Sequence, residues 1–420
     1  MDLNKLLSGV KCSCGRTHTC DIDYVYVEDG AISHLTEICE PYKSILIVAD
    51  ENTYGAAGDK VMEAISDKVV GKTIFTGKKI LIPNEDSVAS VEEDLGGVDL
   101  IVGIGSGVIQ DLCKYVSHTS GIPYMVVATA PSMDGYASDG AAMIWEGMKV
   151  TYKAGLPRAL IADTSVLATA PMEMIKAGYG DIVGKFSALN DWKLSHAVNG
   201  EYFCDYIYSL TYKMIEDTLA IADGLLKRDK ESLRVLTEAL IVVGILMSFA
   251  GSSRPASGSE HHLSHYFEIV GILNGEEYFP HGIDVAYSTV ITAAVREKLL
   301  SRPFPEKVSR EDESVLTRKI REIYSSAADG CIALQKKVGN YSAERSSVYK
   351  EKEDEIRAIL SEVPSAEKIE EILTRVELNM DDFYKMYSKE KIEKAILYSK
   401  DLKDRYTVLW LNYDFGNFGG

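Results

Sequence analysis

The stretch VDLIVGIGSGVIQD, residues 98–111, contains the pattern that decides the fold of this 420-residue chain. Its apolar start predicts a buried strand, and Gly103, Gly105 and Gly107 follow at alternate positions. Glycine lets the backbone turn tightly and approach a pyrophosphate, whose charge the first amides of a following helix can hold. The stretch therefore predicts a strand, a phosphate-binding turn that includes Ser106, and a helix. The spacing differs from the usual dinucleotide fingerprint, so a plain turn is the alternative.

Further apolar runs repeat the strand pattern in the first part of the chain. They are Ser44–Asp50, Tyr124–Ala128 and Ala159–Ala162, and helix-like segments separate them. Short apolar strands that alternate with helices indicate a parallel sheet covered on both faces. We therefore expect residues 1–166 to form an α/β dinucleotide-binding domain.

Polar side chains follow these strands where a ligand would bind. Asp50 ends its strand, and Thr129, Ser132, Asp134 and Ser138 follow the strand at residues 124–128. Ligands collect at the carboxyl ends of parallel strands, and an acidic residue at the position of Asp50 can bind an adenosine ribose 2′-hydroxyl, which favours NAD over NADP. Such residues are also common helix caps and turn residues, so both interpretations stay open.

The pattern then changes from strands to helices. Ser232–Ala250 and Ile283–Leu300 carry apolar residues at helical spacing, and Glu306–Arg405 has the charge-rich composition of amphipathic surface helices. The longest apolar run, Ala239–Gly251, is shorter than the roughly 20 residues that span a bilayer and predicts a buried helix without a membrane span. Residues 167–420 are therefore expected to form an all-helical domain.

Composition restricts the possible partners and the compartment. The net charge of −18 gives a surface that repels phosphate backbones, which argues against nucleic acid or an anionic membrane as the main partner. No basic segment followed by an apolar stretch opens the chain, so we expect a cytoplasmic protein. The seven cysteines, an odd number, fit reduced thiols better than a disulfide framework.

Four potential metal ligands lie close together near the start of the chain. They are Cys12, Cys14, His18 and Cys20, and no second cysteine pair follows them at zinc-finger spacing. The segment is therefore expected to form a strand, a turn and a strand, with a structural metal site as the alternative.

Histidines cluster in the helical part of the chain, where His261, His262, His265 and His281 lie within a short segment. On a helix His261 and His265 share one face, one turn apart, whereas His262 points elsewhere. Two helices could bring His261 and His281 to one ion, with Asp181 as the third ligand. Two imidazoles and a carboxylate leave coordination positions open, as in a catalytic metal site. The structural alternative is a set of hydrogen-bonded histidines at helix ends.

Two further stretches carry a family resemblance. They are AGYGD, residues 177–181, and SRPASGSEH, residues 253–261, which accompany the glycine turn and the segment CSCGRTH at residues 12–18. With these motifs the chain resembles the iron-dependent alcohol dehydrogenase and dehydroquinate synthase superfamily, and within it the bacterial sn-glycerol-1-phosphate dehydrogenases, over about residues 10–300. The resemblance implies an α/β nucleotide-binding domain, an all-helical metal-binding domain and a homodimer.

The resemblance also implies roles for individual residues. Asp181, His261 and His281 match divalent-metal ligands, with nickel favoured, zinc next and iron also allowed. His265 matches the histidine that faces the substrate, and Asp134 matches a substrate-contacting position. The turns that bind NAD or NADP are matched by Gly103, Gly105, Ser106, Gly107, Thr129, Ser132 and Ser138. The Gly-Ile-Gly-Ser-Gly turn departs from relatives that more often have adjacent glycines, which leaves the pyrophosphate contacts open.

These roles imply that NAD(P)H reduces dihydroxyacetone phosphate to sn-glycerol 1-phosphate, a step of phospholipid biosynthesis. The metal would polarise the carbonyl, and His265 or a water that it positions would supply the proton. Phosphate recognition needs cations, and Lys185, one turn after Asp181, and Arg254 are the candidates, although an ion pair would explain either of them equally well.

Three other functions are compatible with parts of the sequence. A glycerol or polyol dehydrogenase would share the fold and the metal ligands but lack a phosphate pocket. A dehydroquinate synthase would need many basic groups around a carboxylated phosphosugar, and few Arg and Lys residues lie near the histidines. A non-enzymatic zinc module built on residues 12–20 would leave the glycine turn and Asp181 without a role.

Overall fold

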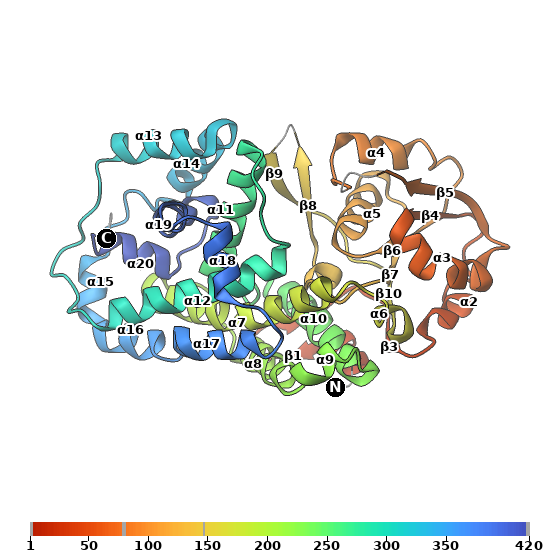
Figure 1. Ribbon diagram of the computed structural model, residues 1–420, viewed down its shortest axis with the longest axis horizontal. Helices are drawn as coiled ribbons and strands as arrows, with labels where there is room; N and C mark the ends of the chain where they lie inside the picture. The colour runs from red at the N-terminus through yellow and green to blue at the C-terminus, as the bar shows by residue number, and fades with distance from the viewer. Residues whose placement is uncertain (1–2, 78–80, 146–147, 417–420) are drawn as a thin grey trace. The chain divides into compact units, whose positions relative to one another are not determined.

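The computed structural model describes residues 3–77, 81–145 and 148–416, which form two compact units (Figure 1). Unit 1 comprises Met1–Tyr179 and Glu216–Ser252, and unit 2 comprises Gly180–Ile215 and Ser253–Gly420. These units differ from the predicted domains, 1–166 and 167–420. The reason is that the apolar segment around residues 230–250 packs within unit 1, although its sequence pattern is purely helical.

A six-stranded sheet forms the centre of unit 1, in the order β3-β10-β7-β6-β4-β5. The strands are β3 (Tyr24–Glu28), β4 (Ile45–Asp50), β5 (Val69–Phe75), β6 (Leu100–Gly105), β7 (Tyr124–Ala128) and β10 (Ala159–Asp163). All neighbouring pairs are parallel, which confirms the predicted sheet. The outermost strands β3 and β5 were not predicted: β3 has an apolar run of only four residues, YVYV, and Gly71 and Lys72 interrupt the apolar residues of β5.

Helices cover both faces of this sheet, because successive side chains along a strand point to opposite sides. Ile45, Ile47 and Ala49 of β4 belong to one buried cluster together with residues of α2 (Leu35–Ile38) and α3 (Glu51–Ile65). The opposite face is covered by α5 (Gly107–Ser120). There a Cβ at Gly105 would lie 2.6 Å from the Cβ of Ile109, so only glycine lets the end of β6 approach α5 this closely.

The remaining elements of unit 1 are short, apart from α10. They are α1 (Leu3–Leu7), β1 (Val10–Lys11), β2 (Thr17–His18), η1 (Ala31–His34), α4 (Glu85–Glu92), η2 (Gly135–Ala137), β8 (Gly140–Trp145), β9 (Met148–Lys153), α6 (Thr164–Leu167), α9 (Ala222–Leu226) and α10 (Lys230–Ala250). β1 pairs with β2 and β8 with β9, both antiparallel. The strand, turn and strand expected over residues 12–20 are found over residues 10–18, because the first strand already ends at Lys11.

Helix α10 contains the predicted buried helix. By length and composition it is the one helix among the described residues that could cross a membrane, but 78% of its apolar window is buried inside the protein. It packs against η2, α6, α9 and β3 within unit 1. Such burial is typical of a core helix in a protein of this size.

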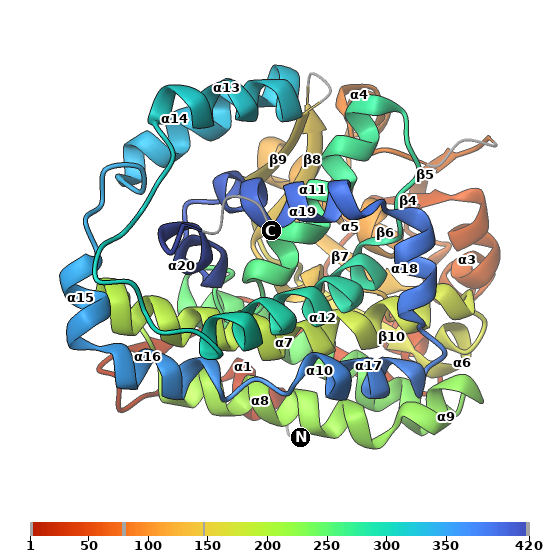
Figure 2. The same cartoon turned by 60° about the vertical axis from the view of Figure 1, so that its left-hand side comes forward.

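The named elements among the described residues of unit 2 are all helices, which confirms the predicted change of fold class. Two helices have residues in both units, α7 (Met172–Asn199) and α8 (Asp205–Ala220). The others are α11 (Ser259–Asn274), α12 (His281–Leu300), α13 (Glu313–Tyr324), η3 (Ser325–Ala327), α14 (Ala328–Val338), α15 (Ser346–Glu351), α16 (Glu353–Leu360), α17 (Ala366–Thr374), α18 (Met380–Met386), α19 (Lys389–Tyr398), η4 (Ser399–Leu402) and α20 (Val408–Asp414). α11 packs along α12, and α17 lies beside α12 on another side (Figure 2).

Candidate active site

Three side chains that suit a metal ion converge in unit 2 from helices far apart in the sequence. Asp181 lies in α7, His261 in the first turn of α11, and His281 is the first residue of α12. Their ligand atoms all lie within 4.8 Å of one another, and Asp181 Oδ1 is 3.6 Å from His261 Nε2. The structure thus brings together the three residues that the sequence analysis grouped as metal ligands. A carboxylate and two imidazoles are a donor set that fits zinc, nickel or iron.

Close helix packing explains why these side chains meet. A Cβ at Gly180 would lie 2.5 Å from the carbonyl oxygen of Gly282, so glycine at position 180 lets α7 approach the first turn of α12. Asp181 and His281 are the chain neighbours of these two glycines. α11 is anchored at its first residue, because the Ser259 amide donates a hydrogen bond of 2.7 Å to Asp191 of α7. The motifs at residues 177–181 and 253–261 therefore set the spacing of the site.

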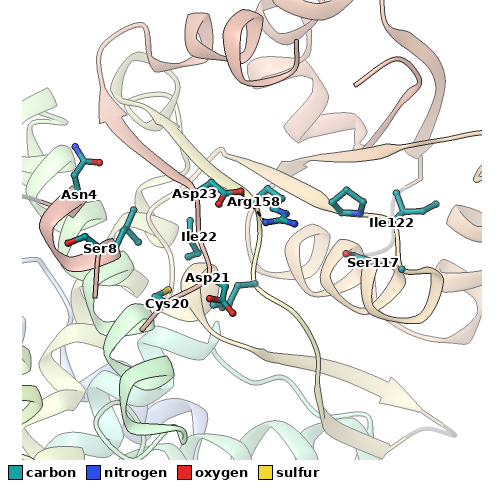
Figure 3. A pocket seen from close by; sticks show the side chains of 13 residues that line it. Asn4, Ser8, Cys20, Asp21, Ile22, Asp23, Ser117, Ile122 and Arg158 are labelled. Atoms are coloured by element: carbon teal, nitrogen blue, oxygen red, sulfur yellow. Dashed lines mark hydrogen bonds and ion pairs between the residues drawn. The ribbon is translucent and has the colours of Figure 1, made fainter. Parts of the chain in front are cut away.

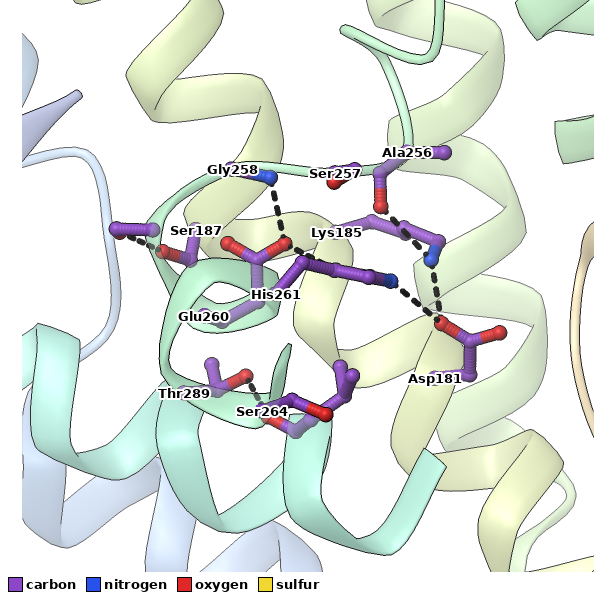
Figure 4. A network of polar contacts seen from close by, with 12 residues as sticks. Asp181, Lys185, Ser187, Ala256, Ser257, Gly258, Glu260, His261, Ser264 and Thr289 are labelled. Atoms are coloured by element: carbon purple, nitrogen blue, oxygen red, sulfur yellow. Dashed lines mark hydrogen bonds and ion pairs between the residues drawn. The ribbon is translucent and has the colours of Figure 1, made fainter. Parts of the chain in front are cut away.

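Glu260 orients His261 by contacting Nδ1, the ring nitrogen that does not face Asp181 (Figure 4). Its Oε1 lies 2.6 Å from His261 Nδ1 and accepts a hydrogen bond of 2.8 Å from the Gly258 amide. When Nδ1 carries the proton, Nε2 keeps its lone pair on the side of Asp181. A carboxylate that holds the far nitrogen of a histidine in this way is a common partner of metal-binding imidazoles. Glu260 was not among the predicted site residues. The sequence feature that could have indicated it is an acidic residue in the first turn of a helix.

Burial and charge favour the protonation states that bind metal. Burial, with a further contribution from Lys185, lowers the pKa of His261 well below its usual range, so the imidazole is neutral. Burial alone would raise the pKa of Asp181, but the nearby ammonium of Lys185 outweighs this and leaves that pKa lowered. Asp181 is therefore an ionised carboxylate.

Replacing Glu260 with glutamine is expected to weaken metal binding by about 10–100-fold, because the amide no longer offers His261 a negative acceptor. The amide oxygen can still accept the Gly258 hydrogen bond, so α11 should keep its start. Affinity is measured by competition with a chromophoric chelator, with Glu268→Gln in the same helix as the matched control. An affinity equal to that of the wild type would show that Glu260 does not orient the ligand.

The two remaining histidines of α11 differ in their surroundings. The His265 ring lies 5.5 Å from that of His281 and 6.1 Å from that of His261, so it borders the group of ligands. His262 is fully buried, and burial lowers its pKa well below the usual range. Neither of its ring nitrogens has a hydrogen-bond partner among the described residues. The structure thus places His265, and not His262, next to the proposed metal site.

The two cations expected at a substrate phosphate already have carboxylate partners. Lys185 Nζ lies 2.7 Å from Asp181 Oδ1 and also donates to the Ala256 carbonyl at 3.0 Å. The Arg254 guanidinium is paired with Glu201 and donates to the Tyr406 carbonyl at 3.0 Å. Both side chains are buried. These contacts agree with the alternative role of both residues, that of a structural ion pair. An ion pair does not prevent either side chain from also binding a phosphate.

Arg405 is a further cation near α11 that the sequence analysis did not single out. It donates hydrogen bonds to the Ser257 carbonyl at 2.8 Å and to Ser253 Oγ at 2.9 Å, both neutral acceptors. Its Nε is buried without a hydrogen-bond partner in the part of the chain that the structure describes. Burial, followed by the nearby charge of Arg254, lowers the pKa of Arg405 to about 10. Its charge is thus less well neutralised than that of Lys185 or Arg254.

A cavity of about 530 Å³ in unit 1 opens beside the glycine turn. Its lining includes Asp50 and Ser106, and adds the carboxylates of Glu51 and Asp86. Ser106 joins the end of β6 to α5, as the sequence predicted. Asp50 also caps α3, because its Oδ1 accepts hydrogen bonds from the amides of Asn52 at 2.8 Å and Thr53 at 2.9 Å. Asp50 can cap α3 and also contact a ligand in the cavity, because its carboxylate has two oxygens and the cap uses Oδ1.

A larger cavity of about 820 Å³ lies elsewhere in unit 1 (Figure 3). Its lining includes Cys20, Asp21 and Arg158 and none of the predicted cofactor-binding residues. Size alone therefore does not identify the coenzyme site; the glycine turn does.

The second predicted turn is a buried loop after β7. It contains Thr129, Ser132, Asp134 and Ser138, each at most 9% exposed. Lys114 of α5 stabilises this loop, because its Nζ donates hydrogen bonds to the carbonyl oxygens of Gly135 at 3.1 Å and Gly140 at 2.8 Å. Burial lowers the pKa of Lys114. This lysine was not predicted, because its position in α5 gives no local sign that it reaches a loop more than 20 residues away.

Comparison with known proteins agrees with these features. The profile of the family described as iron-containing alcohol dehydrogenase matches residues 26–171. A glycerol-1-phosphate dehydrogenase (NAD(P)+) from Halalkalibacterium halodurans is 34% identical over 312 residues, which cover 70% of this chain and 77% of that protein. The protein of the same name from Bacillus licheniformis is 28% identical, with 100% of this chain and 97% of that protein covered.

Solved structures share the fold at low sequence identity. An iron-containing alcohol dehydrogenase from Thermococcus thioreducens is similar with a TM-score of 0.61 at 14% identity, covering 95% of this chain and 100% of that chain. A glycerol dehydrogenase from Schizosaccharomyces pombe gives a TM-score of 0.53 at 18% identity, covering 67% and 74%. The fold, the converging helices of unit 2 and the sequence identity to the relatives lead to one assignment. The chain belongs to the glycerol-1-phosphate dehydrogenase family of the iron-containing alcohol dehydrogenases.

Proposed function

We propose that this chain reduces dihydroxyacetone phosphate to sn-glycerol 1-phosphate with NAD(P)H, in a reversible reaction that depends on a divalent metal. The observation that carries the proposal is the convergence of Asp181, His261 and His281 in a chain that is 34% identical to a glycerol-1-phosphate dehydrogenase. The buried, oriented donor atoms fit a metal, and the cavity beside Ser106 fits a coenzyme.

The chain's own groups prepare the site for hydride transfer. When bound, the metal supplies Lewis acidity toward the C2 carbonyl, and the reduced coenzyme supplies the hydride. Burial keeps His261 neutral, and Glu260 holds its Nδ1 so that Nε2 is directed at the site. We propose that His265, or a water that it positions, gives a proton to the C2 oxygen, which balances the hydride delivered to carbon. Asp134 is proposed to contact the substrate.

Three cations of unit 2 are proposed to recognise the phosphate: Lys185, Arg254 and Arg405. Arg405 is the best placed by charge, because its hydrogen bonds reach only neutral oxygens. A guanidinium can bind two phosphate oxygens at once, which suits this task. Lys185 and Arg254 would need to share their carboxylate partners with the ligand.

The coenzyme preference is proposed to be NADH over NADPH. Asp50, Glu51 and Asp86 line the cavity, and their negative charge disfavours a 2′-phosphate. Replacing Asp50 with serine should move the ratio of kcat/KM for NADPH and NADH toward NADPH by about tenfold, or about 1.4 kcal/mol. Serine still caps α3, so the fold should be retained. Asp59→Ser, at an exposed position of the same helix, is the control, and an unmoved ratio would remove Asp50 from coenzyme selection.

A direct assay tests the proposed function. The protein is stripped of metal and reloaded with nickel, zinc or iron, and oxidation of NADH and NADPH is followed with dihydroxyacetone phosphate. We expect metal-dependent turnover and a product of sn-1 configuration. Comparison of glycerol with glycerol 1-phosphate as substrates separates this function from a polyol dehydrogenase, and turnover of glycerol alone would overturn the proposal.

Several finer properties stay predictions. Nickel or zinc as the metal, a homodimer and a role of the product in phospholipid synthesis follow from the family resemblance, and the cytoplasmic location also stays an expectation. Metal analysis of the purified protein and sedimentation at several protein concentrations would test the first two.

A further inference from the structure

A second group of metal-binding side chains lies in unit 1, apart from the proposed active site. The ligand atoms of Cys12, Cys14 and His18 lie within 4.8 Å of one another. The sequence analysis grouped these residues with Cys20, but Cys20 lines the larger cavity of unit 1 and is not part of the group (Figure 3). The members of the group that belong to unit 1 are therefore two thiols and one imidazole.

The backbone of the β1–β2 hairpin brings these side chains together. The Cys12 amide donates a hydrogen bond to the Arg16 carbonyl at 3.0 Å, and the Gly15 amide donates to the Cys12 carbonyl at 3.1 Å. Gly15 has a φ of +85°, which closes the turn. His18 follows in β2, opposite Val10. Both thiols and the histidine are thus held at one end of a tight hairpin.

The distances match those around a tetrahedral zinc ion. Cys14 Sγ lies 3.5 Å from His18 Nε2. With a Zn–S distance of 2.3 Å and a Zn–N distance of about 2.05 Å, a tetrahedral angle places these two atoms about 3.55 Å apart. A simple thiol–imidazole hydrogen bond has a similar length, but it does not require the thiol of Cys12 to converge on the same point.

His18 is oriented as a ligand would be. Its Nδ1 lies 3.1 Å from the Phe249 carbonyl oxygen in α10, and because a carbonyl only accepts, Nδ1 carries the proton. The lone pair of Nε2 is then directed toward Cys14. The ring is buried and stacks on Phe249 with centroids 5.2 Å apart at an angle of 13°. A backbone carbonyl that fixes the tautomer in this way is typical of metal-binding histidines.

We propose that Cys12, Cys14 and His18 provide three of the four ligands of a structural Zn²⁺ ion that fastens the β1–β2 hairpin to α10. Thiolate and imidazole donors in tetrahedral arrangement select zinc among the common divalent ions. The thiols of Cys12 and Cys14 are partly exposed, so the ion can reach them. This site is independent of the proposed catalytic metal, whose donors include no sulfur.

Metal analysis of three variants of the full-length protein tests the proposal. The double variant Cys12→Ser/Cys14→Ser should lose about one equivalent of zinc per chain and keep the metal held by Asp181, His261 and His281. His261→Ala should lose the other metal and keep this zinc. Cys20→Ala is the matched control and should keep both, because burial raises the pKa of the Cys20 thiol to about 12 and makes it a poor ligand.

X-ray absorption at the zinc edge on the His261→Ala protein gives a second test that leaves the hairpin unchanged. We expect sulfur neighbours at about 2.3 Å together with nitrogen at about 2.0–2.1 Å. A zinc shell of oxygen and nitrogen only, or a protein that holds no zinc after His261 is removed, would overturn the proposal. Retention of all zinc by a folded Cys12→Ser/Cys14→Ser protein would do the same.

Discussion

Replacing His261 with alanine is expected to remove the active-site metal and to lower kcat/KM for dihydroxyacetone phosphate by at least about 1,000-fold, which corresponds to about 4 kcal/mol. Among the described residues His261 supplies one of the three donors that lie within 4.8 Å of one another, and no other described histidine of α11 belongs to that group. Metal content and steady-state kinetics measure the two effects together.

His262→Asn is the matched control for this variant. His262 lies next to His261 in α11 and is equally buried, but its ring nitrogens contact no described donor or acceptor. The control should therefore keep the metal and most of the activity, with a loss of stability only. A His261→Ala enzyme that retained full activity would remove the metal mechanism.

Replacing Gly180 with alanine is expected to cost about 3 kcal/mol or more of stability, because the new Cβ would lie 2.5 Å from the Gly282 carbonyl and 2.7 Å from the Ala286 Cβ. The clash involves backbone, which cannot swing aside as a side chain can. α7 and α12 must separate, which pulls Asp181 away from His281. We expect Tm to fall by roughly 6–12 °C and metal affinity to fall at least about tenfold.

Gly55→Ala is the control for glycine replacement within a helix. A Cβ at Gly55 in α3 would meet nothing within 4 Å, so alanine should stabilise the protein by about 0.5–1 kcal/mol. Calorimetry and chelator competition are applied to both variants. If Gly180→Ala kept wild-type stability and metal affinity, the spacing of α7 and α12 would not control the site.

The predictable parts of this molecule are those with local causes. The strand, turn and helix around Gly105 follow from residues adjacent in the chain, and so does the start of α12 at His281, which Pro280 precedes. The fold class could be predicted from the sequence for the same reason. The edge strands β3 and β5 were not predicted, because a half-exposed strand has a shorter or interrupted apolar run than a central one.

Residues that act through tertiary packing were missed or only partly understood. Lys114, Asp191 and Arg405 reach their partners across many residues of sequence, and nothing in their immediate neighbours signals this. Lys185 was singled out as a candidate phosphate ligand one turn after Asp181, but only the folded chain shows its contact with Asp181. The boundaries of unit 1 could not be predicted either, because α10 belongs to a second segment of this unit, Glu216–Ser252, which is separated in sequence from the first.

The ion pair between Lys185 and Asp181 has a consequence for how the enzyme matures. The ammonium group lies 2.7 Å from the carboxylate and already balances its charge when no ion is bound. We therefore expect the chain to complete its folding before it acquires a catalytic ion, and we expect that ion to be exchangeable afterwards. In the cell, the fraction of active enzyme would then follow the supply of the correct metal and not the yield of folding. Two populations, both fully folded, would differ only in which ion they happened to meet first.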